Sequence, residues 1–181
     1  ERQGKQSTFV DSVRVTDEEA VGVALMVLAG KINKTLVNLI ELKGGSAIGL
    51  SGLDGHMLKA KIKKPELGYV GEIVAIHPEP IKDLLEKGYI PVVSTIGCDK
   101  AGNTYNINAD LVAGKVAEAL GAEKLILLTN ISGVLDENKN LLTGLTTQEV
   151  DRLIETGVIY GGMIPKVGCA LDAVKGGVVS A

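Results

Sequence analysis

Apolar residues recur at helical spacing in several stretches of the chain, and short apolar runs separate these stretches. Thr16-Asp17-Glu18-Glu19 resembles a capping box, and the apolar positions after it predict a helix that ends before Gly30. A second helical stretch covers residues 32–40 and ends at Gly44-Gly45. Residues 47–50 then form an apolar run that predicts a buried strand.

The middle of the chain predicts a hairpin, a helix and a strand. Residues 57–63 partly alternate apolar side chains with lysine, next to Asp54-Gly55, and residues 69–76 continue the strand-rich stretch. This pattern favours a hairpin that is exposed on one face. Residues 78–86 predict a short helix, and the β-branched run at 90–94 suits a parallel strand.

The last part of the chain continues the alternation of helices and strands. A helix is predicted over residues 109–120, a buried strand over 124–128, a helix after the capping box at 146–149, and another helix over 166–174. No repeat or linker interrupts the pattern. It predicts an α/β fold, a three-layer αβα sandwich on a mainly parallel open sheet, with ligands at the carboxyl ends of the strands.

Composition narrows the classes of function. Of the 181 residues, 45% are hydrophobic, which is enough to bury one sizeable core. The net charge is -3, with one Phe, four Tyr and no Trp, so we expect no nucleic-acid partner. We also expect no membrane span, because we find no apolar stretch of the roughly 18 to 20 residues that a span needs. A cytoplasmic protein is expected, or a plastid one if the source is a photosynthetic eukaryote.

Cysteine and histidine are too scarce to indicate a metal site. Cys98 and Cys169 are too few and too far apart for a cysteine zinc site. His56 and His77 are isolated and belong to no metal-binding spacing, so we interpret them as surface or structural residues. No protein-bound metal is therefore expected.

The common phosphate-binding and hydrolase motifs do not occur, but three weaker clusters remain. Asn106-Ile107-Asn108-Ala109-Asp110 places two amides and a carboxylate where a loop enters a helix, although a cap at Asn108 accounts for part of it. The segment 161–166 puts Lys166 near a predicted helix start, which attracts anions, or the lysine is simply solvated. The segment 129–134 follows a predicted strand with small polar residues, or is an ordinary loop.

Taken together, four segments resemble one family, in order and over nearly the whole chain. They are VRVTDEEA, GYVGEI, YNINADLVAGKVAEALGAEKLILLTNISGVL and YGGMIPK, and they resemble the amino-acid kinase family, in particular its members that act on N-acetylglutamate. The sister kinases for aspartate, glutamate, carbamate and UMP share the fold but not this set. The resemblance implies transfer of the γ-phosphoryl group of ATP, with Mg²⁺, to the γ-carboxylate of N-acetyl-L-glutamate in arginine biosynthesis, without a covalent enzyme intermediate.

The resemblance also implies roles for individual residues. Arg14 would hold a carboxylate of acetylglutamate, and Asn106 and Asn108 would bind the same substrate. Asp110 would orient catalytic lysines, and Lys166 would stabilise the transferring phosphoryl group. The nucleotide would bind two loops made of Thr129, Asn130, Ile131, Ser132, Gly133, Val134, Leu135, Val158, Ile159, Tyr160 and Met163. Many members have Asp where Asn130 stands, so no charge-based role is expected there.

The family pattern treats the chain as part of one kinase domain. Residues 1–105, approximately, would bind acetylglutamate and dimerise, and residues 106–181 would bind the nucleotide. The family's Lys-x-Gly-Gly loop would precede residue 1, and the context of Lys43-Gly44-Gly45 differs from that loop. Both ends of the chain resemble cut ends. We therefore expect the 181-residue chain alone to be inactive or weak, and the complete protein to form a homo-oligomer, a dimer or a hexamer.

Two alternatives remain open from the sequence. The first is a kinase of the same fold with aspartate or glutamate as acceptor, against which the segments RVTD and NINAD argue. The second is a binding module that keeps the acylglutamate pocket without phosphoryl transfer, as in the kinase-like half of some acetylglutamate synthases. The presence of Lys166 and Asp110 argues against this second alternative.

Overall fold

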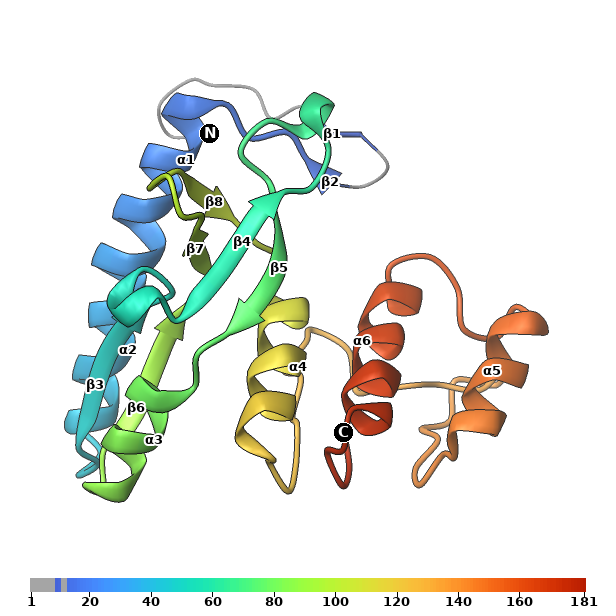
Figure 1. Cartoon of the computed structure of the whole chain (residues 1–181). Helices are drawn as coiled ribbons and strands as arrows, with labels where there is room; N and C mark the ends of the chain where they lie inside the picture. The colour runs from blue at the N-terminus through green and yellow to red at the C-terminus, as the bar shows by residue number, and fades with distance from the viewer. Residues whose placement is uncertain (1–8, 11–12) are drawn as a thin grey trace. The chain divides into compact units, whose positions relative to one another are not determined.

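The computed structural model describes residues 9–10 and 13–181, and the chain divides into two compact units, Glu1–Val112 and Ala113–Ala181 (Figure 1). The first unit holds most of the strands, and the second consists mainly of helices and loops. The division falls inside one helix, α4 (Ala109–Leu120). Each unit has buried apolar residues of its own.

One continuous helix spans residues 18–41 of the first unit. It consists of α1 (Glu18–Leu25), a π-helical segment η1 (Met26–Ile32) and α2 (Asn33–Glu41). The prediction that Gly30 ends the first helix was wrong, because Gly30 lies inside η1. A glycine costs only about 1 kcal/mol in a helix interior, which contacts elsewhere along a helix of this length can offset.

The helix begins one residue later than the predicted capping box. Asp17 is its N-cap, because its side chain accepts the N–H of Ala20 at 2.8 Å. Thr16 is buried instead, with 1% of its surface exposed, and its backbone bonds to Leu67 and Tyr69. These hydrogen bonds pair the backbone of Thr16 with the segment 67–69, and Asp17 caps the helix instead.

A pair of parallel strands lies alongside this helix, as Figure 1 shows. Strand β3 (Ala47–Ser51) pairs in parallel with β6 (Ile90–Ser94), which confirms both predicted strands and their direction. The buried side chain of Asn33 joins the helix to the pair, since its Nδ2 donates to the carbonyl oxygens of Leu50 at 3.0 Å and Val92 at 2.7 Å.

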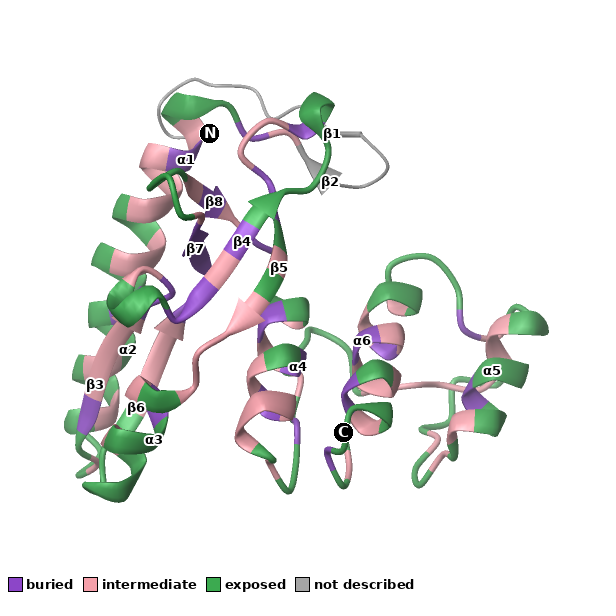
Figure 2. Ribbon diagram, viewed as in Figure 1, coloured by how far each residue is buried: buried purple, intermediate pink, exposed green. Residues whose placement is uncertain are grey.

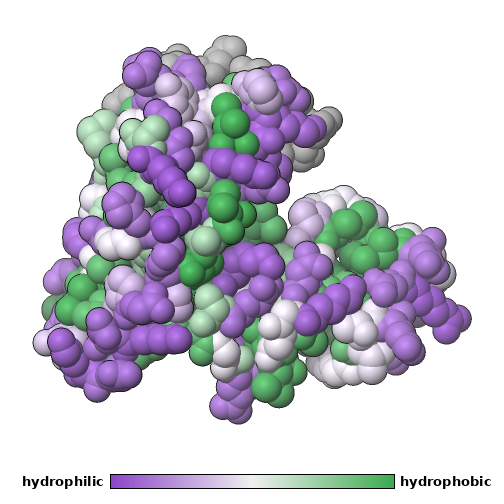
Figure 3. Space-filling view, in the orientation of Figure 1, coloured by the Kyte–Doolittle hydropathy of each residue, from purple (hydrophilic) through white to green (hydrophobic). Residues whose placement is uncertain are grey.

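Helix α3 (Glu79–Glu86) connects the hairpin region to β6 and confirms the helix predicted over residues 78–86. Ile81 is buried at 3% exposure and anchors it, whereas its charged residues are exposed. The space-filling view shows this end of the first unit as a hydrophilic area (Figure 3). The alternation of faces is that of an amphipathic surface helix.

The strands predicted over residues 57–63 and 69–76 are confirmed as β4 (Leu58–Ile62) and β5 (Gly71–Ile76), which pair antiparallel in a hairpin. Asp54-Gly55 lies before the hairpin, in the short 3₁₀ helix η2 (Asp54–His56), rather than in its turn. A second 3₁₀ helix, η3 (Pro65–Leu67), lies in the connection between the two strands.

Two further strands complete a four-stranded sheet of order β5-β4-β7-β8. Strand β7 (Ile96–Cys98) pairs in parallel with β4 and antiparallel with β8 (Thr104–Asn106). Buried residues gather on β4 and β7 (Figure 2). A separate short pair, β1 (Phe9–Val10) and β2 (Val13–Arg14), lies near the N-terminus.

Three helices build the second unit. Helix α4 begins and ends as predicted, and α5 (Thr147–Glu155) begins at the predicted capping box, in which Thr146 and Glu149 cap each other reciprocally. Helix α6 (Met163–Lys175) begins three residues before the predicted helix over 166–174. Gly114 allows close packing, because a Cβ there would lie 3.0 Å from the Sγ of Cys169 on α6.

The buried strand predicted over residues 124–128 does not form. Only Lys124 makes a bridge, with Ser180, and Ile126 and Leu128 are 69% and 92% exposed. A strand needs a neighbour that bonds along its whole length, and the described part of the chain supplies a single bridge here. The prediction was wrong, because apolar composition alone does not supply the hydrogen bonds of a neighbouring strand.

The long helix also corrects the expectation about membrane-span length. Glu18–Glu41 contains 24 residues, its most apolar window has a mean hydropathy of 1.5, and 11% of that window is buried. By length and composition alone this helix could cross a membrane. Many apolar side chains of this helix are therefore exposed in the described structure, and this exposure needs an explanation.

Candidate functional site

Three segments of the predicted site lie side by side in the first unit because backbone hydrogen bonds join them. Thr16, two residues after Arg14, donates its N–H to the carbonyl oxygen of Leu67 at 3.0 Å, and its own carbonyl accepts the N–H of Tyr69 at 2.7 Å. The carbonyl oxygen of Tyr69 accepts the N–H of Asn106 at 2.9 Å. The segments VRVTD, GYVGE and NINAD, which are distant in sequence, thus meet at Tyr69.

Gly68 makes this close approach possible. Its φ of 66° lies in the left-handed region, and a Cβ at this position would collide with the carbonyl oxygen of Thr16. Any side chain at residue 68 would push the Thr16 segment away from the connection between β4 and β5. The glycine is therefore a structural requirement of this part of the site.

The backbone of Arg14 belongs to β2, immediately before the Thr16 contact. Its side chain lies outside the described atoms. The assignment of its guanidinium to a substrate carboxylate stays a prediction, supported by the position of its strand beside the Tyr69 segment.

The two asparagines of NINAD differ in their surroundings. Asn108 is the N-cap residue of α4, because its Oδ1 accepts the N–H of Leu111 at 3.1 Å. Asn106 ends β8, and its half-buried amide makes no hydrogen bond with any residue that the structure describes. An amide in this position is available to a ligand, so Asn106 is the better candidate for substrate recognition. The Nδ2 of Asn108 remains free to donate while its oxygen caps the helix.

Asp110 lies in the first turn of α4, half-buried. The N-terminal end of a helix carries partial positive charge, which stabilises a carboxylate there. The sequence NINAD therefore supplies a cap, a negative charge and an unbonded amide within one turn. A helix start requires only the cap. The carboxylate and the unbonded amide are additional polar groups that a ligand could contact.

In the second unit, Lys166 is the fourth residue of α6 and is half-buried. No side chain caps this helix, whose N-cap is Gly162. A lysine near the positive end of a helix dipole is unfavourable by up to about 1 kcal/mol, and both the dipole and the ammonium attract an anion. The helix start and Lys166 together could therefore attract a phosphate group.

The two predicted nucleotide loops converge on one apolar cluster of the second unit. Val134 from the first loop and Met163 at the start of α6 pack against the buried residues Val150, Ile159 and Val167. Ile159 itself is 3% exposed and its N–H donates to the carbonyl oxygen of Leu153 at 3.0 Å, so this residue serves the core. Among the other predicted residues, Thr129, Asn130, Ile131, Ser132 and Tyr160 are exposed, and Gly133, Leu135 and Val158 are half-buried.

A tight loop that sequence analysis did not identify follows the first nucleotide loop. Asp136 accepts hydrogen bonds from the N–H of Asn138 and from the backbone and side-chain nitrogens of Asn140, and these bonds lower its pKa. Lys139 adopts a φ of 64° in this loop. The signal in the sequence was an Asp followed four residues later by an Asn, a pattern typical of Asx turns.

The same loop occurs in the first unit. Asp99 accepts from Ala101 and from both nitrogens of Asn103, and Gly102 has a φ of 87° at the position that corresponds to Lys139. The hydroxyl of Tyr105 also donates to Asp99 at 2.9 Å. Hydrogen bonds, with that from the Asn103 side chain first, lower the pKa of Asp99 to about 2.

The α/β units, with polar loops at strand ends and helix starts, match the amino-acid kinase fold. A crystal structure of smu.665 from Streptococcus mutans UA159 superimposes with a TM-score of 0.87 and is 34% identical, over 98% of this chain and 72% of that one. An N-acetylglutamate synthase from Neisseria gonorrhoeae, in complex with coenzyme A and N-acetyl-glutamate, superimposes with a TM-score of 0.82 at 26% identity, over 98% of this chain and 41% of that one.

The chain belongs to the amino acid kinase family, which it matches over residues 1–181. Its curated relatives include the acetylglutamate kinase of Acinetobacter baumannii (strain ATCC 17978), which is 64% identical over 98% of the chain. The acetylglutamate kinase of Hydrogenovibrio crunogenus is 51% identical over 99% of it. The chain spans 63% and 65% of the lengths of these two relatives.

Proposed function

We propose that the protein carrying this chain transfers the γ-phosphoryl group of ATP to the γ-carboxylate of N-acetyl-L-glutamate. The observation that carries the proposal is the 64% identity with an acetylglutamate kinase over 98% of the chain. The geometry adds support, because the unbonded amide of Asn106 and the helix-start lysine Lys166 are groups that this reaction needs.

Each candidate residue has a role in this mechanism. Arg14 and Asn106 hold the acetylglutamate, with Asn108 as a further donor, so that its γ-carboxylate oxygen attacks the γ-phosphorus in line. The bond between the γ-phosphorus and the bridging oxygen breaks, and ADP leaves with the electron pair. Lys166 meets the charge that develops on the phosphoryl oxygens, and Asp110 orients the lysine charges.

Mg²⁺ would reach the site with the phosphates of ATP. The described residues contain no group of three or more His, Cys, Asp or Glu side chains that could hold a metal ion. Because Mg²⁺ keeps several waters and commonly binds substrate phosphates, such a group is not required. When bound, the ion would neutralise phosphate charge.

A homo-oligomer explains the exposed apolar side of the long helix. Met26, Leu36 and Leu39 are 64%, 46% and 52% exposed, whereas Lys34 donates to the carbonyl oxygen of Gly49 at 2.9 Å. A lipid environment would be costly for Lys31 and Lys34, the exposed lysines of this helix. A second copy of the protein would cover the apolar residues without that cost. Leu36→Glu is expected to shift the complete protein toward a smaller species in light scattering.

The competing function is an acylglutamate-binding domain without phosphoryl transfer. It is favoured only by the likeness to the Neisseria gonorrhoeae synthase, at 26% identity. The deciding experiment measures ADP release by the complete protein with MgATP and, separately, acetylglutamate, glutamate or aspartate. ADP release that depends on acetylglutamate supports the proposal. Binding of acetylglutamate without ADP release would establish the binding domain, and a preference for aspartate or glutamate would establish a sister kinase.

A further inference from the structure

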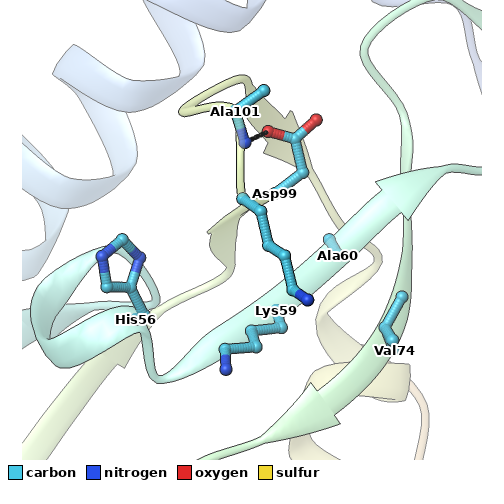
Figure 4. Close-up of a pocket in the computed structure, with 7 residues that line it drawn as sticks. His56, Lys59, Ala60, Val74, Asp99 and Ala101 are labelled. Carbon is cyan, nitrogen blue, oxygen red and sulfur yellow. Dashed lines mark hydrogen bonds between the residues drawn. The ribbon is translucent and has the colours of Figure 1, made fainter.

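A cavity of about 590 Å³ lies in the first unit. Figure 4 shows residues of its lining, which come from η2, from β4 and β5, and from the loop between β7 and β8. The lining residues are His56, Lys59, Ala60, Val74, Asp99, Lys100 and Ala101. This volume is within the usual range for small-molecule sites.

The cavity lies at the opposite end of β8 from Asn106. The loop that carries Asp99 and Lys100 leads into β8 at Thr104, whereas Asn106 ends the strand. None of the residues assigned to acetylglutamate or ATP lines the cavity.

Two lysines give the cavity positive charge. The ammonium groups of Lys59 and Lys100 make no ion pair or hydrogen bond with any part of the chain that the structure describes. Lys61, also on β4, differs, because it pairs with Glu72 at 3.3 Å. Two ammonium groups around one cavity repel each other, and an anion between them would relieve that repulsion.

Asp99, the acidic residue of the lining, does not neutralise these lysines by contact. Its two oxygens accept four hydrogen bonds, from Ala101, from the two nitrogens of Asn103 and from Tyr105, at 2.8 to 2.9 Å. The same hydrogen bonds hold its pKa low, so the carboxylate is charged but fully occupied. Its role is to fix the loop that presents Lys100.

His56, at the edge of the cavity, has an unusual backbone conformation and contacts Cys98. Its φ of 51° is in the left-handed region, which is unusual for a residue other than glycine, and such positions cost about 1 to 3 kcal/mol. Its Nδ1 lies 3.3 Å from the Sγ of the buried Cys98. The other ring nitrogen, Nε2, remains for a ligand.

We propose that this cavity binds a small phosphorylated molecule, whose phosphate group lies between Lys59 and Lys100 with a hydrogen bond from His56. A phosphate carries more negative charge and more acceptor oxygens than a carboxylate, so it can contact both ammonium groups and the His56 ring at the same time. Ala60, Ala101 and the 61% exposed Val74 provide an apolar surface for the carbon part of the ligand. The site is independent of the proposed kinase function.

The test is a titration of the full ¹⁵N-labelled protein with inorganic phosphate, followed by NMR at the amides of Lys59, Lys100 and Ala101. NaCl at matched ionic strength is the reference. Saturable shifts are expected, and Lys100→Gln or Lys59→Gln is expected to raise the dissociation constant about tenfold or more. Lys100 is exposed, so its variant tests the site without disturbing the core.

Two control variants separate this site from general charge and from the kinase site. Lys61→Gln removes a nearby lysine outside the cavity, and Lys166→Met removes a lysine of the second unit, so both are expected to leave the affinity within about twofold. The proposal is overturned if phosphate shifts these amides no more than NaCl does. It is also overturned if Lys61→Gln weakens binding as much as Lys100→Gln does.

Phenyl phosphate distinguishes an organic ligand from free phosphate. We expect it to bind several-fold more tightly than inorganic phosphate, and Val74→Ser to remove the difference, because burying a few apolar carbons contributes on the order of 1 kcal/mol. Equal affinities for the two anions in the parent protein would assign the cavity to free phosphate and would overturn the organic part of the proposal.

Discussion

The backbone N–H of Asn106 donates to the carbonyl oxygen of Tyr69 at 2.9 Å, while the amide side chain of Asn106 has no partner among the described residues. The backbone bond fixes the position of the residue and leaves its side-chain amide available to a ligand. A residue that is held by its main chain can present its side chain to a ligand without a large loss of entropy on binding.

Asn106→Ala is expected to reduce the preference for acetylglutamate over glutamate and aspartate. A buried amide that pairs with one acceptor is left unsatisfied by the wrong ligand, which separates substrates by about 1 to 3 kcal/mol. Relative kcat/KM values for the three acceptors measure the effect in the complete protein. Asn108→Ala removes the α4 cap, so it should lower the melting temperature. Its effect on the substrate preference should be smaller than that of Asn106→Ala. Unchanged preference in Asn106→Ala would contradict the assignment.

Lys166→Met is expected to lower turnover about a hundredfold to a thousandfold, because a preorganised charge acts mainly on the transition state. Methionine keeps much of the length and apolar packing of the half-buried side chain. ADP release at saturating substrates measures turnover, and thermal melting checks the fold. Turnover within about threefold of the parent would mean that the charge comes from elsewhere.

Asn33→Ala is expected to lower the free energy of unfolding by about 1 to 3 kcal/mol, since it removes two hydrogen bonds and leaves two part-buried carbonyl groups without this donor. The lost bonds are those to Leu50 and Val92, which join the long helix to both parallel strands. Chemical denaturation measures the change. Asn38→Ala, an exposed site in the same helix, serves as the control and should shift stability by no more than about 0.5 kcal/mol. Equal effects of the two changes would argue against the proposed role of Asn33.

Lys139→Gly is expected to stabilise the protein by roughly 0.5 to 1 kcal/mol. The left-handed conformation costs a lysine about 1 to 2 kcal/mol, and the greater freedom of glycine in the unfolded chain offsets part of the gain. Gly102 already occupies the corresponding position of the Asp99 loop, so Gly102→Lys should have the opposite effect. A rise in melting temperature for the first variant and a fall for the second are the expected readings. A fall in both would show that the two loops are not equivalent.

Acid should remove a contribution of Asp99 to stability. Its pKa falls from an ordinary 3.8 to about 2 in the folded chain, because the folded state favours the charged form. The contribution is therefore complete above pH 3.8 and is lost as the pH falls toward 2. Asp99→Asn should lose less stability over this interval than the parent, and the exposed Asp83→Asn should behave like the parent. Denaturant midpoints across the interval provide the measurement, and parallel curves for all three proteins would contradict the prediction.

The sequence correctly predicted the elements that depend on residues close together in the chain. The capping box at Thr146 and Glu149, the helix 109–120 and the strand at 90–94 formed as predicted. Each depends on residues within a few positions of one another. The segment RVTD and the run NINAD likewise carried the family resemblance, which the match over residues 1–181 confirmed.

Tertiary structure decided the features that depend on distant residues. Thr16 is not the N-cap, because its backbone forms hydrogen bonds with Leu67 and Tyr69. Residues 124–128 do not form a strand, because the described residues offer them a single bridge. The cavity lined by His56, Lys59 and Lys100 also gathers residues from separate strands and loops. The sequence by itself determined most of the helices, the four strands β3 to β6 and the family, because hydrophobic spacing and capping act within a few residues. Only the folded chain decided which polar groups were bonded and which remained free, because their partners lie tens of residues away.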